Sequence, residues 1–283
     1  MILEAVAEHH NKVKDSILEQ ALKEAKLSME DIDLISYSEG PGLAPALLVG
    51  KYFALELSKK YNKKLLGVNH IVAHLEIGLN TTKAKDPIFL FCSGANTQVI
   101  AHEGGKYRVF GEALSIAIGN AFDKFARNIG LGFPGGPQIE KLAKDGNYLK
   151  LTYNVKGMDV DFSGLITQAT NLFQKGASKE DLCFSLQETA FAMLIEVTER
   201  ALAHCEKNEV LLIGGVAANK RFAEMLNDMC EARNAKAYTV ELQYAGDQGA
   251  MIAYQGYLEK ERKQKEFDII PRWRIDEIDT FWK

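Results

Sequence analysis

His70 and His74, four residues apart, are the residues of this chain whose types and spacing most directly suggest chemistry. On a helix this spacing places both imidazoles on one face, one turn apart. Two ring nitrogens can then bind a single metal ion at about 2 Å each. The apolar residues 65–68 indicate a buried strand just before them, so the histidines would begin a helix at a strand's carboxyl end, where open α/β sheets bind ligands. The spacing alone does not decide, because such pairs are more often surface or core residues.

The elements that must position these histidines follow from the periodicity of apolar residues. We expect an N-terminal lobe at 1–85, a C-terminal lobe at 86–260 and a C-terminal tail at 261–283. Helices are expected at about 2–27, 45–61, from 70 onward, 178–206, 217–232 and 247–260, strands at 33–37, 65–68, 88–92, 97–102, 107–110, 209–213 and 236–240, and a helical insert with a glycine- and proline-rich loop at about 116–176.

The order of predicted elements recurs in the two halves of the chain. Each half contains helix, strand, glycine turn, helix, strand and helix, as in a duplicated α/β fold. The last helix begins with the histidines in the first half and with Asp247 in the second. If the halves are pseudo-symmetric, both helix starts face one cleft. His70, His74 and Asp247 could then bind one ion, a donor set suited to iron or zinc.

Three glycine-containing segments and one aspartate offer further chemistry. Residues 93–98 link two strands and suit a phosphate, although a polar hairpin turn has the same composition. Residues 132–137 could clamp a planar ligand or form an ordinary loop. Residues 214–219 follow a buried strand and enter a helix, the geometry of phosphate or adenosine binding, although a glycine pair there also serves tight packing. Asp123, next to Lys124 on a helix, is typical of a solvated face.

The composition limits the possible classes of function. With 283 residues, 47% apolar and 25% charged, the chain is an ordinary globular protein long enough for two domains. It has no apolar run of membrane-spanning length and no signal-peptide pattern, so we expect a cytoplasmic location. The net charge of −4 disfavours broad nonspecific nucleic-acid binding, but a local basic patch could bind RNA. The four cysteines are expected to be reduced core residues, and residues 259–265 a solvated helix end.

Six motifs, in order, resemble a known family, the universal tRNA threonylcarbamoyladenosine synthases once described as glycoproteases. They occupy residues 38–43, 69–74, 93–98, 156–164, 214–221 and 247–253 and so cover essentially the whole chain. The Lys-Gly-Met-Asp string at 156–159 is similar to archaeal or eukaryotic members, which are the catalytic subunit of the KEOPS complex. The resemblance implies a duplicated actin/Hsp70/sugar-kinase-like α/β fold of two lobes around a cleft. It also implies transfer of the threonylcarbamoyl group from threonylcarbamoyl-AMP to the N6 amine of the adenosine 3′ of the anticodon in tRNA.

The resemblance also implies roles for individual residues. His70, His74 and Asp247 match the ligands of one divalent metal per chain, iron or zinc. The implied partners are tRNA, threonylcarbamoyl-AMP, and the kinase and small dimerising subunits of a KEOPS-type complex, with no membrane. No general base is assigned, and no catalytic residue beyond the metal site. The implied substrate-binding residues are Asp123, Gly136, Glu140 and Asn219 for the adenylate, and Phe91, Cys92, Ser93, Gly94 and Ala95 for the intermediate.

The chain departs from the family's pattern in several places. Archaeal members usually carry a tyrosine, a further metal ligand, where this chain has Phe91, and Ala95 and Gln248 replace a glycine and an asparagine. Members also begin with roughly 35 to 40 residues that form a strand meander, whereas this sequence starts at the following helix. The first lobe would then have a two-stranded sheet with an exposed edge. The start could lie upstream, which we favour because the ligand set is intact, or another polypeptide could complete the sheet, or the chain could be a reduced paralogue.

Other functions remain open at this level. The chain could be a non-catalytic or partner-completed scaffold of the same complex. The glycine turns would also suit an actin-like-fold ATPase or kinase. A zinc peptidase is disfavoured, because its motif places a glutamate directly after the first histidine, whereas Glu76 follows the second.

Overall fold

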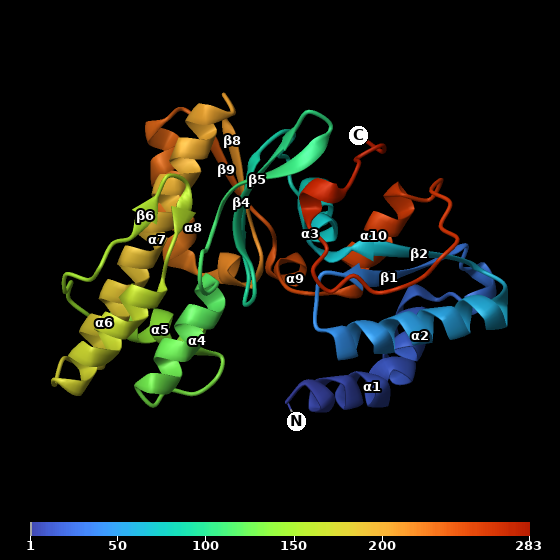
Figure 1. Cartoon of the computed structure of the whole chain (residues 1–283), viewed down its shortest axis with the longest axis horizontal. Helices are drawn as coiled ribbons and strands as arrows, with labels where there is room; N and C mark the ends of the chain where they lie inside the picture. The colour runs from blue at the N-terminus through green and yellow to red at the C-terminus, as the bar shows by residue number, and fades with distance from the viewer. Residues whose placement is uncertain (1) are drawn as a thin grey trace. The chain divides into compact units, whose positions relative to one another are not determined.

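The computed structural model describes residues 2–283, apart from the side chains of residues 2 and 3. Contacts divide the chain into two compact units, Met1–Ile77 with Gln248–Lys283 and Gly78–Asp247. Both units combine parallel strands with helices packed on them, so the fold is a mixed α/β fold (Figure 1). Helix α3 (His70–Thr81) crosses the division between the units.

The first unit is built on two parallel strands. β1 (Leu34–Gly40) pairs with β2 (Lys64–Asn69), and among the described residues these two strands form the whole sheet of this unit. Two short turns, η1 (Met29–Asp31) and η3 (Ile275–Glu277), complete the unit. The helices that pack here are α1 (Ile2–Ala25) on α2, α2 (Ala44–Tyr61) on both strands, and α10 (Gly249–Leu258) on both strands.

Helix α10 lies close against β1 because of a glycine. A Cβ atom on Gly256 would lie 1.7 Å from the hydroxyl oxygen of Ser36. Only glycine allows the helix backbone to approach the strand this closely. This packing joins α10 and the residues after it to the first unit, so the compact units divide the chain differently from the expected boundaries at residues 85 and 260.

The C-terminal segment returns along the end of β1. The backbone N–H of Ile270 donates to the carbonyl oxygen of Glu39 at 2.7 Å, and that of Gly42 donates to Pro271 at 3.2 Å. Glu259 is buried, accepts a hydrogen bond from Gln255 and forms an ion pair with Arg262. The expectation of a solvated helix end at 259–265 therefore holds only in part. Glu259 is buried and Gln264 donates to Glu39, whereas Lys260, Glu261, Lys263 and Lys265 are exposed.

The second unit contains a five-stranded mixed sheet in the order β5-β4-β3-β8-β9. β3, β4 and β5 form an antiparallel meander, whereas β8 runs parallel to both β3 and β9. The strands are β3 (Ile88–Cys92), β4 (Thr97–Glu103), β5 (Lys106–Glu112), β8 (Glu209–Ile213) and β9 (Lys236–Thr239), and a separate hairpin is formed by β6 (Val155–Lys156) and β7 (Asp159–Val160).

The long helix α7 (Lys179–His204) forms the centre of the core of the second unit. Its apolar residues recur every three or four positions and are buried. Phe191 on this helix stacks on Phe222, with ring centroids 4.3 Å apart. The other elements of this unit are α4 (Ile118–Asn128), α5 (Gly135–Ala143), α6 (Ser163–Gln174), η2 (Gly215–Ala218), α8 (Lys220–Ala232) and α9 (Leu242–Ala245).

Most predicted elements are confirmed, and the differences are local. The helix expected at 217–232 begins at Lys220, because residues 215–218 form the 3-10 turn η2 and Asn219 caps the helix. The helix expected from Asp247 begins at Gly249, because the side chain of Gln248 accepts from the N–H of Met251 and caps it. The insert at 116–176 also contains the hairpin β6–β7, which the helical periodicity did not indicate.

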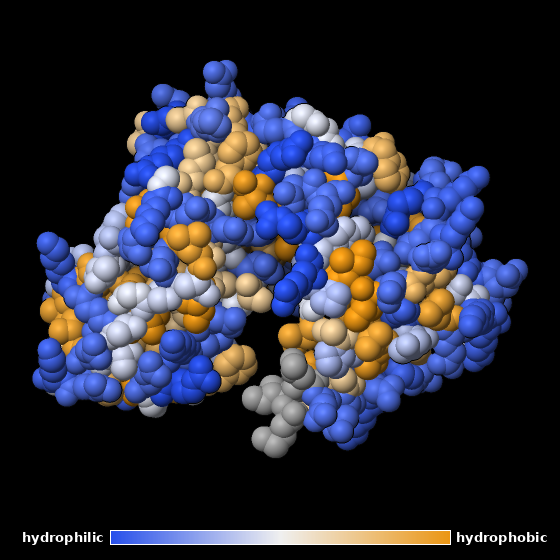
Figure 2. Space-filling model, viewed as in Figure 1, coloured by the Kyte–Doolittle hydropathy of each residue, from blue (hydrophilic) through white to orange (hydrophobic). Residues whose placement is uncertain are grey.

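The surface view shows a mainly hydrophilic face with apolar residues in separate patches (Figure 2). No helix in residues 2–283 combines the length and apolar character that crossing a membrane requires.

Candidate functional site

The junction of β2 and α3 positions the two histidines. Asn69 ends the strand, and its side-chain oxygen accepts hydrogen bonds from the N–H groups of Ile71 and Val72, both at 3.0 Å. These N–H groups at the start of a helix have no partner within the helix, so the cap satisfies them. Because the cap is the last strand residue, His70 is the first residue of α3.

The three predicted metal ligands lie together. One ligand atom from each of His70, His74 and Asp247 can be chosen so that all lie within 4.8 Å of one another. His74 is buried, His70 is half-buried and Asp247 is exposed. The two imidazole rings meet edge to face, with centroids 4.9 Å apart. Solvent therefore reaches this group from the side of Asp247, whereas His74 is enclosed by the protein.

The geometry fits one metal ion. Bonds of about 2.0 to 2.2 Å place the ligand atoms of a tetrahedral ion about 3.4 Å apart, so the three donor atoms, now within 4.8 Å of one another, would move closer together to hold one. Two imidazoles and one carboxylate suit zinc or a non-haem iron and leave positions open for a substrate or water. The donor set does not distinguish these metals.

Asp247 is placed by helix α10. It directly precedes Gln248, the capping residue whose side-chain oxygen accepts from Met251 at 2.8 Å. The division into compact units counts Asp247 as the last residue of the second unit. In the sequence it directly precedes Gln248, so its backbone lies at the start of α10. The packing of α10 on β1 and β2 thus determines where this carboxylate lies.

A second candidate site lies within the second unit. A cavity of about 220 Å³ is lined by Gly94, Asp123, Gly136, Glu140 and Asn219 together with parts of α4, α5 and η2. These are five of the predicted substrate-binding residues. The remaining four, Phe91, Cys92, Ser93 and Ala95, are not among its lining residues, and Phe91 and Cys92 are buried in β3.

Hydrogen bonds fix the polar groups of this cavity. Asp123 accepts from the N–H of Gly135 at 2.7 Å, which ties α4 to the start of α5. Glu140 accepts from the N–H of Lys220 at 3.0 Å, at the start of α8. Asn219 is buried, caps α8 through Phe222 at 3.1 Å and donates to Gln187 at 2.9 Å. Hydrogen bonds within the protein thus position the polar lining of the cavity.

Two glycines bring backbones together beside this cavity: Gly214, which belongs to the glycine pair considered above for tight packing, and Gly119, which the sequence did not indicate. A Cβ on Gly119 would lie 2.7 Å from the Cα of Gly94, and a Cβ on Gly214 would lie 2.3 Å from the carbonyl oxygen of Cys92. Gly214 also has φ of +99°, a conformation that other residues rarely adopt. Both contacts bring the backbone of the 92–94 segment against a neighbouring element, which sequence spacing alone does not reveal.

A larger cavity of about 510 Å³ lies beside α4 and shares Asp123 with the first one. It was not predicted. One signal in the sequence was the 132–137 segment, considered above as a clamp for a planar ligand, since Gly132 and Phe133 line this cavity. A second was the spacing of Asn120, Lys124 and Arg127 on one helix face, of which only the Asp123–Lys124 pair was considered, as a solvated face.

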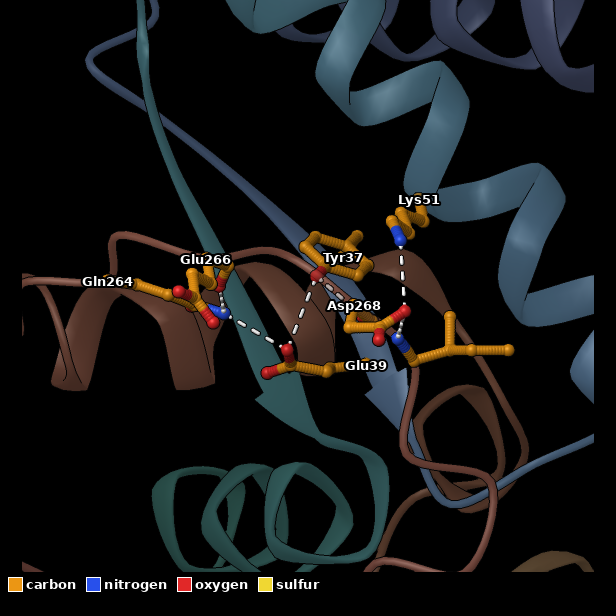
Figure 3. A network of polar contacts seen from close by, with 7 residues as sticks. Tyr37, Glu39, Lys51, Gln264, Glu266 and Asp268 are labelled. Atoms are coloured by element: carbon orange, nitrogen blue, oxygen red, sulfur yellow. Dashed lines mark hydrogen bonds and ion pairs between the residues drawn. The ribbon is translucent and has the colours of Figure 1, made fainter.

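A polar network in the first unit secures the end of β1 (Figure 3). The Tyr37 hydroxyl donates to the carbonyl oxygen of Asp268 at 2.9 Å and lies 3.4 Å from a carboxylate oxygen of Glu39. Gln264 donates to the same oxygen of Glu39 at 3.0 Å, and Lys51 pairs with Asp268 at 3.1 Å. Burial raises the pKa of Glu39. The network holds the C-terminal segment on the strand.

Glu76 also belongs to the C-terminal contacts. The indole N–H of Trp282 donates to it at 2.9 Å, and Lys283 pairs with it at 3.3 Å. It is thus engaged by the C-terminal residues, in agreement with the argument against a zinc peptidase. All four cysteines are free thiols, three of them buried, as predicted, and burial raises the pKa of Cys92.

Comparison with known proteins gives consistent matches. Residues 3–254 match the family described as tRNA N6-adenosine threonylcarbamoyltransferase. A protein of that description from Thermococcus sibiricus is 52% identical over 282 residues, covering 98% of this chain and 87% of the relative. A probable bifunctional tRNA threonylcarbamoyladenosine biosynthesis protein from Methanobrevibacter smithii is 50% identical over 280 residues. The chain spans about half, 52%, of the length of that bifunctional relative.

Solved structures share the fold at low identity. HypF of T. kodakarensis is similar with a TM-score of 0.66 and 18% identity, covering 83% of this chain and 42% of that one. The activator of 2-hydroxyisocaproyl-CoA dehydratase from Clostridium difficile has a TM-score of 0.51 and 12% identity, covering 89% and 85%. These likenesses concern the fold alone.

Proposed function

Because this chain belongs to the tRNA N6-adenosine threonylcarbamoyltransferase family, we propose that it carries out that transfer itself. In the proposed reaction the threonylcarbamoyl group moves from threonylcarbamoyl-AMP to the N6 amine of the adenosine 3′ of the anticodon in tRNA. The observation that carries the proposal is that His70 and His74 lie in one donor group with Asp247, which is far from them in the sequence.

The adenylate part of the donor is assigned to the cavity of about 220 Å³ that Asp123, Gly136, Glu140 and Asn219 line. Asp123 and Glu140 each use one carboxylate oxygen for a backbone N–H, and within the described residues the other oxygen accepts no hydrogen bond. These oxygens would accept from the ribose hydroxyls or the adenine amine. Gly136 has no atom within 4 Å of where a Cβ would be, so the backbone is open to a ligand there, and Asn219 closes the cavity. Of the 91–95 segment, Gly94 lines this cavity and would lie against the rest of the intermediate, whereas Phe91 and Cys92 would support it from within β3.

The metal site would hold one divalent ion, iron or zinc, through His70, His74 and Asp247. Such an ion polarises a carbonyl group and stabilises the negative charge of a leaving phosphate. Phe91 cannot act as a phenolate ligand, so three protein ligands would hold the ion. The residues of the cavity contribute by orientation, because holding donor and amine together removes much of the entropic cost of the reaction.

The proposal also includes the detailed fold, the partner subunits and the cellular location. These are the duplicated actin-like fold with a cleft between lobes at 1–85 and 86–260, the KEOPS-type kinase and small dimerising subunits as partners, and a cytoplasmic location. The repeated order of elements and the structural likenesses support the fold, and the bifunctional relatives support an association with a second activity.

The proposal is tested by reconstituting the reaction with tRNA, threonine, bicarbonate, ATP and an adenylate-forming enzyme. Wild-type chain is compared with His70→Ala and with His10→Ala, a matched change of an exposed histidine on α1. We expect product and one metal per chain from wild type and His10→Ala, and neither from His70→Ala.

Three other outcomes would contradict it. Equal product from His70→Ala would exclude the metal role. Wild-type protein without metal or product would favour the scaffold function. Turnover of ATP by the chain alone, without tRNA, would favour an ATPase.

A further inference from the structure

The cavity of about 510 Å³ beside α4 has no role in the function proposed above. It lies wholly within the second unit and shares one residue, Asp123, with the cavity assigned to the adenylate. Its lining residues are Ile116, Asn120, Asp123, Lys124, Arg127, Leu131, Gly132 and Phe133.

One wall of this cavity is basic. Lys124 and Arg127 are three residues apart on α4, so they lie on the same helix face, and both are exposed. Within residues 2–283 neither is paired with a carboxylate, whereas Arg221, Arg233 and Arg274 all are. The carboxylate of Asp123 is partly occupied by the N–H of Gly135. Two cations without an ion-pair partner therefore face solvent at this wall, and Asp123 is the one acidic residue of the lining.

The lining of the same cavity also includes an exposed aromatic ring. Phe133 is 86% exposed, the highest fraction among the large apolar side chains of the described residues. The loop that carries it is anchored on both sides, by the N–H of Leu131 to Ala126 at 2.8 Å and that of Gly135 to Asp123 at 2.7 Å. An anchored, solvent-facing ring offers a stacking surface at a low cost in conformational entropy.

The same loop serves both cavities. Its first half, Leu131 to Phe133, lines the larger cavity, and its second half, from Pro134, lines the adenylate cavity. A group stacked on Phe133 would therefore lie next to the bound donor. A flat apolar ring beside unpaired cations is the combination that binds a base and its phosphates in single-stranded nucleic acid.

We propose that this cavity binds an unpaired part of the RNA substrate, with a base stacked on Phe133 and phosphate oxygens on Lys124 and Arg127. The inference rests on the proposed function, since it takes tRNA as the acceptor. It also accounts for RNA binding by a chain of net charge −4, because the attraction is confined to one local patch.

The test measures affinity of the full chain for an unmodified anticodon stem-loop RNA by fluorescence anisotropy across a salt series. Phe133→Ala should weaken binding roughly fivefold to 100-fold, and Phe133→Trp should restore it. The double variant Lys124→Gln/Arg127→Gln should reduce the slope of log affinity against log salt by about 1.4. Phe281→Ala, a matched change of an exposed ring in the first unit, and Lys175→Gln should change neither quantity.

A double-mutant cycle locates the base. Making each loop nucleotide abasic in turn should weaken binding to the wild type, and at one position the loss should disappear in Phe133→Ala. Equal RNA affinity of wild type, Phe133→Ala and the double cation variant would overturn the inference. Failure of the transferase proposal is separately visible, because it is read from product formation and metal content rather than from RNA affinity.

Discussion

Two junctions between a parallel strand and a helix carry the two candidate sites, and they differ in one respect. At both, an asparagine caps the helix, Asn69 for α3 and Asn219 for α8. β2 passes into α3 without a connecting residue, whereas β8 is separated from α8 by Gly214 and the 3-10 turn η2.

The inserted turn changes what the junction can bind. Where the strand enters the helix directly, side chains of the first helical turn are presented, and His70 and His74 form a donor group with Asp247. Where the glycine turn intervenes, the backbone meets β3 at Cys92 and leaves a cavity lined by Gly215 and Asn219. A direct junction thus gathers candidate metal donors in one case, and a junction with a glycine turn lines a cavity in the other.

The largest expected effect comes from changing one residue in each site and comparing metal binding with adenylate binding. Asp247→Ala should abolish metal binding and lower product formation by at least about 100-fold, with the fold unchanged because the residue is exposed. Asn219→Ala should instead weaken adenylate binding and leave metal content intact. Elemental analysis and calorimetric titration with AMP measure both. Metal retained by Asp247→Ala would break the distinction between the junctions.

The second prediction concerns the glycine turn. Gly214→Ala should destabilise the protein by at least about 3 kcal/mol, because it combines a strained φ with a clash against the carbonyl of Cys92. Gly215→Ala is the matched control, since nothing lies within 4 Å of its Cβ position. Urea unfolding measures both free energies. Similar stabilities of the two variants would show that the inserted turn is not constrained.

The third prediction concerns the cap of the direct junction. Asn69→Ala leaves two buried N–H groups without their partner, so we expect a loss of about 2 kcal/mol of stability and weaker metal binding. Asn69→Ser, which retains a capping oxygen, should recover part of both losses. Thermal unfolding and metal titration test this. Unchanged metal affinity in Asn69→Ala would show that the cap does not position His70.

The smallest effect is a difference in pH dependence between the units. Burial raises the pKa of Glu39 in the first unit, so its stabilising contribution is present below the unfolded value near 4.5 and is lost as pH rises. Hydrogen bonds from Ser115 and Ser163 lower the pKa of Asp161 in the second unit, so its contribution is lost as pH falls below 3.8. Glu39→Gln should flatten the loss of stability that begins as pH rises above about 4.5, and Asp161→Asn the loss as pH falls below 3.8. The same slope in wild type and variants would contradict the assignment.

Much of the fold and part of the site could be predicted because their causes are local. Apolar periodicity located the long helices and both sets of strands, and the Asn69 cap with its two histidines is encoded within a few residues. The cavity at Phe133 and the role of Gly119 could not be predicted, because they depend on which backbones meet. Residues 261–283 were expected only as a C-terminal tail, and their contacts with Tyr37 and Glu39 on β1 could not be predicted, because they join distant segments.

The sequence by itself determined the class of fold, the family and the candidate metal donors, because periodicity, caps and motifs are short-range properties of the chain. Only the tertiary structure decided that Asp247 meets His70 and His74, and that the loop around Phe133 lines two cavities. The physical reason is that these contacts join segments distant in sequence. Their geometry is set by the packing of whole elements, such as α10 on β1 through Gly256, and not by any local preference.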